Sequence, residues 1–245
     1  MTSPLRLQQM LKLLDLTRLN EADSNAEMAD WLNDTAKPAA VPAAFCVYPQ
    51  FITQTLTHLQ QQRIAVPVAT VVNFPGGDLA IEQVVAQINE AIALGATEID
   101  AVLPYKALLG GELAVVKHFM QEVRKACGDT LLKIIIESGE LGTAQQVGKA
   151  AELAIDGGAD FVKTSTGKVP VGVTLEAARI ILTAIASANR PVGFKASGGV
   201  RSVAQALELM QLYEDITGQL ANPAGLRIGA STLLTELLEA LRQQS

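Results

Sequence analysis

Short runs of β-branched and other apolar residues alternate along the chain with longer stretches rich in Ala, Leu, Gln and Glu. The short runs have the length and composition of buried strands. They predict eight strands, at Leu13–Leu16, Ala44–Tyr48, Val66–Asn73, Glu98–Leu103, Leu131–Glu137, Asp160–Thr166, Pro191–Ala196 and Leu226–Gly229. The longer stretches predict helices, among them Leu79–Leu94, Glu112–Cys127, Thr143–Asp156, Thr174–Ala188, Val203–Tyr213 and Leu233–Arg242. Strands that alternate with helices in this way form a parallel sheet.

The number and character of the strands favour a closed barrel over an open sheet. Strands with continuous apolar residues, such as 134–136, suit a sheet that is covered on both faces. Gly95 and Gly158 follow predicted helices at positions where a helix end needs a positive φ. Neither a GxGxxG fingerprint after the first strand nor a GxxxxGK[ST] phosphate loop is present. We therefore predict an α/β fold, a single (β/α)8 TIM barrel that occupies residues 1–245 as one domain.

Composition and charge narrow the function classes. With 49% hydrophobic residues the chain can bury a large core, and its net charge of −6 argues against general binding of nucleic acid or of acidic membranes. No apolar stretch reaches 18 residues and no secretion signal is evident. Cys46 and Cys127 form no CxxC pair, which suits a reducing, cytoplasmic location. The two histidines, His58 and His118, have no ligand-like spacing, so we expect neither a metal nor a cofactor.

The chemistry of a barrel lies at the carboxyl ends of its strands, and two neighbouring strands here contain a lysine. Lysine is among the residues least often buried, although a single one can extend its ammonium to the rim. Lys163 and Lys195 occupy adjacent predicted strands, and Asp100 is expected near them. A neighbouring cation lowers the pKa of a lysine, and a neutral amine attacks a carbonyl to form an imine. We therefore predict Lys163, Asp100 and Lys195 as catalytic, with Asp100 transferring protons.

Glycine-rich segments after the last strands predict a phosphate site. Residues 197–201 combine two glycines with an arginine, and residues 229–232 open a predicted helix. Barrel enzymes commonly bind phosphate after strands seven and eight, at a helix N-terminus. A tight turn alone would explain one such segment but explains two on adjacent strands less well. The predicted phosphate-binding residues are Gly167, Lys168, Gly198, Gly199, Arg201, Gly229, Ser231 and Thr232.

Four further polar positions are predicted to line the pocket. They are Asp15, Thr17, Cys46 and Thr166. Cys46 has no histidine partner on a strand, so it is interpreted as a small buried side chain and not as a nucleophile. The fifth predicted strand also contains Lys133 and Glu137, to which we assign no role.

The chain resembles the deoxyribose-phosphate aldolase family. The matching segments, in order, are Leu14–Thr17, Cys46–Pro49, Val72–Pro75, Glu98–Asp100, Lys133–Glu140 (KIIIESGE), Phe161–Lys168 (FVKTSTGK), Gly193–Arg201 (GFKASGGVR) and Ile228–Leu233 (IGASTL). The resemblance implies a metal-free class I lyase that reversibly splits 2-deoxy-D-ribose 5-phosphate into acetaldehyde and D-glyceraldehyde 3-phosphate. It implies Lys163 as the Schiff-base lysine, with Asp100 and Lys195 as its proton-relay and pKa-setting partners. It also implies a homodimer, and phosphate contacts for Gly167, Gly198, Gly199, Arg201, Gly229 and Ser231.

One departure and three alternatives accompany the resemblance. Some members of the family end in a longer tail whose tyrosine assists proton exchange, whereas this chain stops at Arg242-Gln243-Gln244-Ser245 and we expect that contribution to be missing. Another Schiff-base barrel enzyme, such as a transaldolase or keto-acid aldolase, would share the lysine but use a ketone donor. A phosphosugar isomerase or synthase would have no covalent step. A phosphosugar-binding regulator would need no pair of buried ammonium groups.

Overall fold

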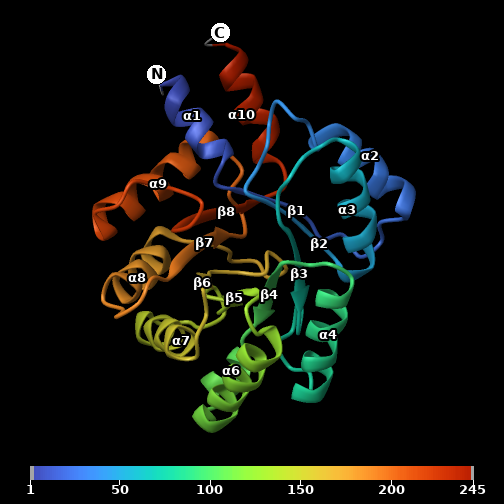
Figure 1. The fold of residues 1–245 in the computed structure, drawn as a ribbon. Coiled ribbons are helices and arrows are strands. Elements are labelled where there is room, and N and C mark those ends of the chain that lie inside the picture. The colour runs from blue at the N-terminus through green and yellow to red at the C-terminus, as the bar shows by residue number, and fades with distance from the viewer. Residues whose placement is uncertain (1–2, 244–245) are drawn as a thin grey trace.

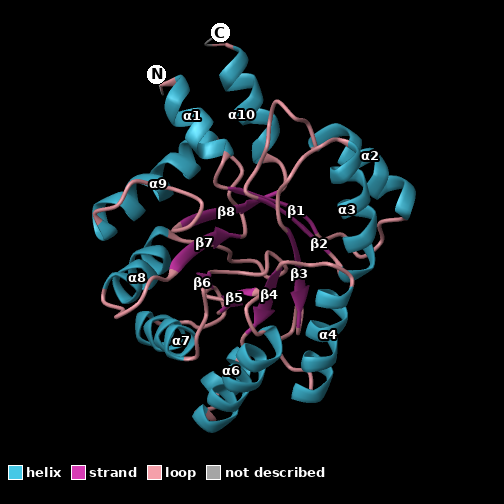
Figure 2. Ribbon diagram, in the orientation of Figure 1, coloured by secondary structure: helices cyan, strands magenta, loops and turns pink. Residues whose placement is uncertain are grey.

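The computed structural model describes residues 3–243 and shows a closed ring of parallel strands surrounded by helices (Figures 1 and 2). Each strand pairs with the next along the chain, and the last pairs with the first. The strands are β1 (Leu14–Arg18), β2 (Ala44–Val47), β3 (Val68–Val72), β4 (Glu98–Val102), β5 (Leu131–Ile135), β6 (Phe161–Lys163), β7 (Gly193–Ser197) and β8 (Leu226–Ala230). The predicted (β/α)8 barrel is confirmed.

Helices follow every strand and cover the outside of the barrel. They are α1 (Pro4–Leu11), α2 (Asn25–Thr35), α3 (Ile52–Gln61), α4 (Ile81–Ala93), α5 (Tyr105–Leu109), α6 (Leu113–Cys127), α7 (Ala144–Asp156), α8 (Leu175–Ala186), α9 (Val203–Thr217) and α10 (Leu233–Arg242), with a short 3-10 helix, η1 (Pro49–Phe51), before α3. Hydroxyl side chains start several of them: Thr143, Thr174 and Ser202 each accept a hydrogen bond from a backbone N–H of the first turn. None of the helices within residues 3–243 is long and apolar enough to cross a membrane.

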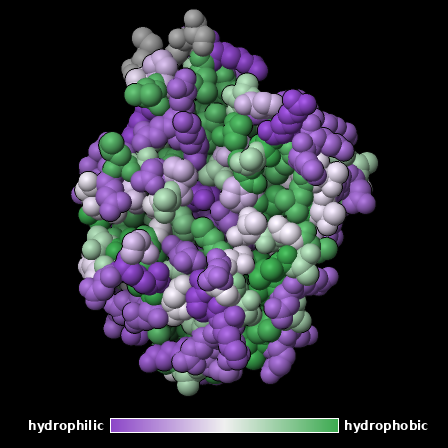
Figure 3. All heavy atoms as spheres, in the orientation of Figure 1, coloured by the Kyte–Doolittle hydropathy of each residue, from purple (hydrophilic) through white to green (hydrophobic). Residues whose placement is uncertain are grey.

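The apolar core lies between the outer face of the strands and the inner faces of the helices. Strand residues such as Ile134 and Phe194 are fully buried there, together with helix residues such as Ile88 and Ile181. This double cover explains why the strands have continuous apolar sequences. On the face seen in Figure 3, hydrophilic residues are spread between smaller groups of hydrophobic ones. Charged residues such as Asp100 and Lys195, by contrast, are fully buried within the ring of strands.

The predicted elements coincide with observed ones, with some differences at their ends. Gly95 and Gly158 have the positive φ expected after a helix, 100° and 88°. The sixth strand is shorter than predicted and ends at Lys163, and the chain continues as the loop in which the Thr164 hydroxyl donates to the backbone carbonyl of Ser197. Gln244 and Ser245, at the end that lacks the tail tyrosine, lie outside the described residues.

Candidate active site

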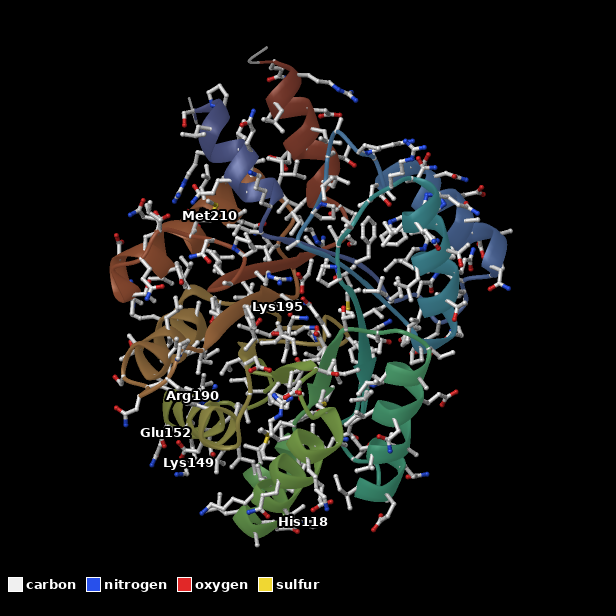
Figure 4. The ribbon with its side chains drawn as sticks, viewed as in Figure 1. His118, Lys149, Glu152, Arg190, Lys195 and Met210 are labelled. Atoms are coloured by element: carbon white, nitrogen blue, oxygen red, sulfur yellow. The ribbon has the colours of Figure 1, made fainter. Side chains whose placement is uncertain are left out.

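The interior of this barrel is filled largely by charged side chains. Barrels of this kind usually fill the ring with branched apolar residues. Here, Lys133, Lys163, Lys195 and Arg227 share it with Asp15, Glu98 and Asp100, and each of the seven is at least 93% buried, since the most exposed, Arg227, is 7% exposed. Lys195, labelled in Figure 4, lies within the ring of strands. Groups of this kind are tolerated only where they are paired and hydrogen-bonded.

The three residues predicted as catalytic meet at one carboxylate oxygen. Lys163 and Lys195 lie side by side in register on β6 and β7, so their side chains enter the barrel together. Asp100 Oδ2 accepts hydrogen bonds from Lys163 Nζ at 2.7 Å and from Lys195 Nζ at 2.8 Å. Two contacts of 2.7 and 2.8 Å to one atom place the two ammonium nitrogens no more than 5.5 Å apart. The sequence therefore located the three residues that the fold brings together.

A third lysine, Lys133, occupies the other oxygen of the same aspartate. Lys133 is the register partner of Asp100 on β5, and its Nζ donates to Asp100 Oδ1 at 2.8 Å. It also donates to Glu98 Oε2 at 2.5 Å. Glu98 lies two residues before Asp100 on β4, so both carboxylates enter the barrel from the same face of that strand. Both oxygens of Asp100 are thereby engaged by cations.

Asp15 and Arg227 complete the group of charges. Arg227 donates through Nη1 to Asp15 Oδ1 at 2.7 Å and through Nη2 to Glu98 Oε1 at 3.2 Å. Asp15 Oδ2 lies 2.5 Å from Lys195 Nζ, an ion pair without the direction of a good hydrogen bond. Asp15 was predicted to line the pocket, and the structure places it fully buried within this group of charges. We call the seven residues the ion cluster.

Burial and neighbouring charges act differently on the lysines of the cluster. Burial lowers the pKa of Lys163, and the charge of Lys195 lowers it further, while Asp100 opposes both. For Lys195, burial is outweighed by Asp100 and Asp15, which raise its pKa. Asp100 is likewise held well below its usual pKa, because the lysines outweigh its burial. The sequence predicts a lowered pKa for Lys163, and the structure agrees. The sequence argument attributes the shift mainly to the charge of Lys195, whereas in the structure the main cause is burial.

Two predicted lining residues lie on neighbouring strands, Thr17 on β1 and Cys46 on β2. They are register partners, and the Thr17 hydroxyl donates to the backbone carbonyl of Asp15 at 2.8 Å. Cys46 is fully buried and packs against Ala69 and Val71. Burial raises the pKa of its thiol, so Cys46 remains protonated and forms part of the wall.

The loops after β6 and β7, where phosphate is predicted to bind, pack directly against each other. Gly167 and Gly198 both have positive φ, 78° and 84°, and a Cβ on Gly167 would lie 3.8 Å from the Gly198 Cα. Val173 N donates to the Gly198 carbonyl at 3.0 Å. Gly199 also has a positive φ and is exposed, with open space where a side chain would stand. Positive-φ turns of this kind are among the backbone conformations that can present N–H groups to an anion.

Side chains at the end of β5 fix the loop that follows β6. Thr166 donates from its hydroxyl to Glu137 Oε2 at 2.5 Å and from its backbone to Glu137 Oε1 at 3.1 Å. Its hydroxyl accepts from Lys168 N at 3.0 Å. The ammonium of Lys168 donates to the Leu19 carbonyl at 2.6 Å, so this predicted phosphate ligand spans from the β6 loop to the loop after β1.

The remaining predicted phosphate residues differ in their surroundings. Gly229 lies inside β8, where a Cβ would stand 2.9 Å from the Cβ of Ser197 and 3.2 Å from the Cε of Lys195, so its lack of a side chain gives Lys195 room. Ser231 and Thr232 are exposed before α10. Within residues 3–243, no hydrogen bond or ion pair engages the Arg201 guanidinium or the Ser231 hydroxyl, which leaves both available to a ligand.

Comparisons with known proteins identify the family. Residues 9–235 match the family model described as DeoC/LacD family aldolase. The chain belongs to this aldolase family. A crystal structure from Coccidioides immitis, provisionally assigned as a deoxyribose-phosphate aldolase, is 28% identical, with 96% of this chain and 86% of that chain covered and a TM-score of 0.84. The aldolase QR15 is also 28% identical, with 96% of both chains covered and a TM-score of 0.80.

A more distant structure shows the same fold. The tetrameric deoxyribose phosphate aldolase from Aeropyrum pernix is 20% identical, with 99% of this chain and 94% of that chain covered and a TM-score of 0.69. At this identity the likeness concerns the architecture, which the two chains share over nearly their full lengths.

Three members of the ion cluster of this aldolase were not predicted as site residues. Lys133, Glu98 and Arg227 are charged residues inside apolar strands, the same signal that identified Lys163 and Lys195. Lys133 was noted without a role, and Glu98 and Arg227 were missed because each stands near the start of its strand, away from the carboxyl end. The sequence therefore contains the signal for these residues, but a search restricted to the carboxyl ends of the strands does not find them.

A large cavity of the aldolase lies away from the candidate site. It has a volume of about 890 Å³ and lies at the opposite end of the barrel, where Leu131, Phe161 and Gly193 begin their strands. Arg227 forms part of its wall. Among residues 3–243, no group of three or more His, Cys, Asp or Glu side chains is arranged to hold a metal ion.

Proposed function

We propose that this aldolase reversibly cleaves 2-deoxy-D-ribose 5-phosphate into acetaldehyde and D-glyceraldehyde 3-phosphate through an imine on Lys163. The observation that carries the proposal is the position of Lys163 among the three buried lysines. Its side chain is 3% exposed, whereas those of Lys133 and Lys195 are 0% exposed. It is also the one of the three whose pKa is lowered overall, because burial there is not outweighed by carboxylates, so it combines access with a tendency towards the neutral amine that an attack on a carbonyl needs.

The reaction follows from this arrangement. The neutral amine of Lys163 adds to the C1 aldehyde of the open-chain sugar, and the carbinolamine loses water to give an iminium ion. The proton of the C3 hydroxyl is then removed, and the C2–C3 bond breaks. The three-carbon aldehyde leaves, and its electron pair remains on the two-carbon fragment as an enamine. Protonation at C2 and hydrolysis release acetaldehyde and regenerate the amine.

Asp100 and Lys195 support these proton transfers. Asp100 Oδ2 contacts both ammonium groups, so it can pass protons between Lys195 and the intermediates on Lys163. Lys195 remains charged because its two carboxylate partners raise its pKa. A permanent cation beside Lys163 favours the neutral form of that lysine and also counters negative charge that develops on the substrate.

The loops after β6, β7 and β8 supply the phosphate end of the site. Gly167, Gly198 and Gly199 offer backbone N–H groups in positive-φ conformations, while the side chains of Arg201 and Ser231 lie exposed and have no partner among residues 3–243. The two cysteines are free and buried, which fits a cytoplasmic enzyme. We further propose that the enzyme is a homodimer in solution.

Trapping with acetaldehyde and borohydride tests the proposal. We expect irreversible alkylation of one lysine, located by peptide mapping at Lys163, and no label in Lys163→Met. Lys149→Met, which removes an exposed lysine on α7, is the matched control and should be labelled like the wild type. Label at Lys133, Lys168 or Lys195 in the wild type would refute the assignment. A protein that is trapped only by ketone donors would instead be a transaldolase or keto-acid aldolase.

A further inference from the structure

The three buried lysines differ in how many carboxylates surround them. Lys133 Nζ lies within 4 Å of three carboxylates, those of Glu98 at 2.5 Å, Asp100 at 2.8 Å and Asp15 at 3.6 Å. Lys195 has two such partners, Asp15 and Asp100. Lys163 has one, Asp100, and shares its oxygen with Lys195. Nearby carboxylates stabilise the charged form of a lysine. The number of carboxylate partners therefore ranks the three lysines by how firmly each retains its proton, with Lys133 first and Lys163 last.

The charges of the ion cluster do not balance when every member is ionised. Four cations, Lys133, Lys163, Lys195 and Arg227, face three carboxylates, Asp15, Glu98 and Asp100. A surplus positive charge in a buried site is costly, and loss of one proton removes the surplus. The lysine with the fewest carboxylate partners gives up its proton most readily.

The distal half of the cluster determines which oxygens are left for the reactive lysine. Arg227 is held by the Pro223 carbonyl and by the ring of Phe161, 5.5 Å away, and it occupies one oxygen each of Asp15 and Glu98. The second oxygen of Glu98 accepts a hydrogen bond from Lys133, and Lys133 also donates to Oδ1 of Asp100. Only then does Oδ2 of Asp100 remain, among the described residues, to be divided between Lys163 and Lys195.

We propose that Lys133, Glu98 and Arg227 are positioning residues that select Lys163 as the nucleophile and set its protonation from the far half of the barrel. The proposal rests on the function proposed above and adds three residues to it that do not contact the substrate. Lys133 acts on Lys163 in two ways, and both favour the neutral amine. Its charge disfavours the ammonium form of Lys163, and its bond to Asp100 Oδ1 weakens the hold of that carboxylate on Lys163.

Other groups that face Lys163 leave this effect separable. They are Asp100 from β4, Lys195 from β7, Cys46 from β2 and Glu137 at the end of β5. Glu137 is engaged by Thr166 and lies beyond ion-pair distance of the described lysines. A substitution at residue 98 or 133 replaces none of these side chains, so a shift measured in such a variant begins in the distal half of the cluster and reaches Lys163 through charge and through Asp100.

A double-mutant cycle tests the proposal. Lys133→Met removes one cation, Glu98→Gln removes one carboxylate, and the double variant removes both and restores the original surplus of one. The measurement is the pH midpoint for trapping of Lys163 with acetaldehyde and cyanoborohydride, with circular dichroism and melting to confirm folding. We expect Lys133→Met to raise the midpoint by about 1–2 pH units and Glu98→Gln to lower it by about half a unit. The double variant should lie between the wild type and Lys133→Met.

The experiment distinguishes failure of the positioning role from failure of the proposed function. Midpoints in any other order, or single variants that remain within about 0.2 units of the wild type, overturn the positioning role while labelling of Lys163 still supports the function. If Lys133→Met does not fold, a downward shift in Glu98→Gln that the double variant reverses supports the proposal, and its absence overturns it. Failure to label Lys163 in the wild type defeats the proposed function itself. Lys149→Met, whose side chain lies on the outside of α7 (Figure 4), should leave the midpoint unchanged.

Discussion

Asp100 Oδ2 holds two ammonium groups at once, so the charge of Lys195 acts on Lys163 at close range. At a separation of at most 5.5 Å and an effective dielectric constant near 20, the repulsion between the two charges is at least about 3 kcal/mol, and it lowers the pKa of Lys163. Lys195→Leu removes this repulsion and leaves Asp100 Oδ2 to Lys163 alone, so the pKa of Lys163 should rise.

The measurement for Lys195→Leu is the pH dependence of kcat/KM. Because the reaction needs the neutral amine, the acid limb should move upward by about 1–3 units, and activity at pH 7 should fall. Asp100→Asn serves as the contrast, since it should slow the proton transfers while some Lys163 remains trappable. An unchanged pH profile in Lys195→Leu would show that Lys195 acts only in proton transfer.

The phosphate end of the site can be tested at Arg201 and Ser231. Both side chains are exposed and unpartnered among the described residues, so their replacement should not disturb the fold. A charge-assisted hydrogen bond contributes about 1.5–3 kcal/mol. Arg201→Leu and Ser231→Ala should therefore each lower kcat/KM for 2-deoxyribose 5-phosphate by about 10- to 150-fold and affect free 2-deoxyribose little. Equal losses on both sugars would remove these residues from the phosphate site.

Single residues show where prediction from the sequence succeeded and where it stopped. Lys163 and Lys195 were identified because lysines in apolar strands need a reason and because adjacent strands place them together. The partner of each ammonium could not be assigned in the same way, since the oxygen that a lysine occupies depends on strand register and tilt. The role of Lys133 depends on the register of β4 and β5, which places Asp100 opposite Lys133.

At the scale of elements, the loops after β6 and β7 depend on two backbones that pack without side chains between them. A Cβ on Gly172 would overlap the carbonyl group of Gly198, so Gly172→Ala should push the two loops apart. We expect weaker binding of the phosphorylated sugar, seen as a raised KM, while trapping of Lys163 by acetaldehyde persists because β6 itself is unaffected.

The matched control for Gly172→Ala is Gly148→Ala, inside α7. A Cβ there would meet Ile180 at 3.6 Å, an ordinary contact, and alanine is the better helix former. Gly148→Ala should therefore leave KM unchanged and increase the free energy of unfolding by about 0.5–1 kcal/mol. A normal KM in Gly172→Ala would mean that the packing of the two loops does not shape the phosphate site.

The eight strands and six of the helices could be predicted because their hydrophobic pattern is strong and their length is typical. The short helices were harder. α5 has five residues and η1 has three, too few for a helical period to be recognised. α2 begins with a capping box between Ser24 and Glu27, a local signal that the pattern analysis did not use.

At the scale of the whole molecule, the ion cluster links stability to pH at both extremes. The pKa values of Asp15 and Asp100 are lowered in the folded state, so their contribution is present above about pH 4 and is lost as the pH falls through their folded values. Lys133 and Lys195 have raised pKa values, so their contribution is present below about pH 10.4 and is lost as the pH rises further. Lys163 has a lowered pKa, so its contribution has the opposite sign: it favours the folded state increasingly as the pH rises from its folded value towards about 10.4, and it changes nothing further above that pH.

Urea unfolding between pH 2.5 and 11.5 measures this dependence. The free energy of unfolding should be nearly constant around neutrality and should fall below about pH 4 and above about pH 10.4. Asp100→Asn should be less stable at neutral pH and should show a shallower fall on the acid side, because one carboxylate no longer contributes. Equal acid slopes in the two proteins would show that Asp100 is not ionised in the folded state.

The closed pairing inside the barrel also constrains how such a chain can change over evolutionary time. Loss of one partner from a buried pair costs about 3–5 kcal/mol, a large part of the 5–15 kcal/mol by which proteins are typically stable. A lineage that alters residue 98 must therefore soon alter residue 133 or 227, or lose the fold. In a deep alignment of relatives these three positions should covary, and a chain with an apolar residue at one of them should have lost an opposite charge at another. The centre of the barrel would thus be inherited as a unit, while the loops around its mouth remain free to diverge.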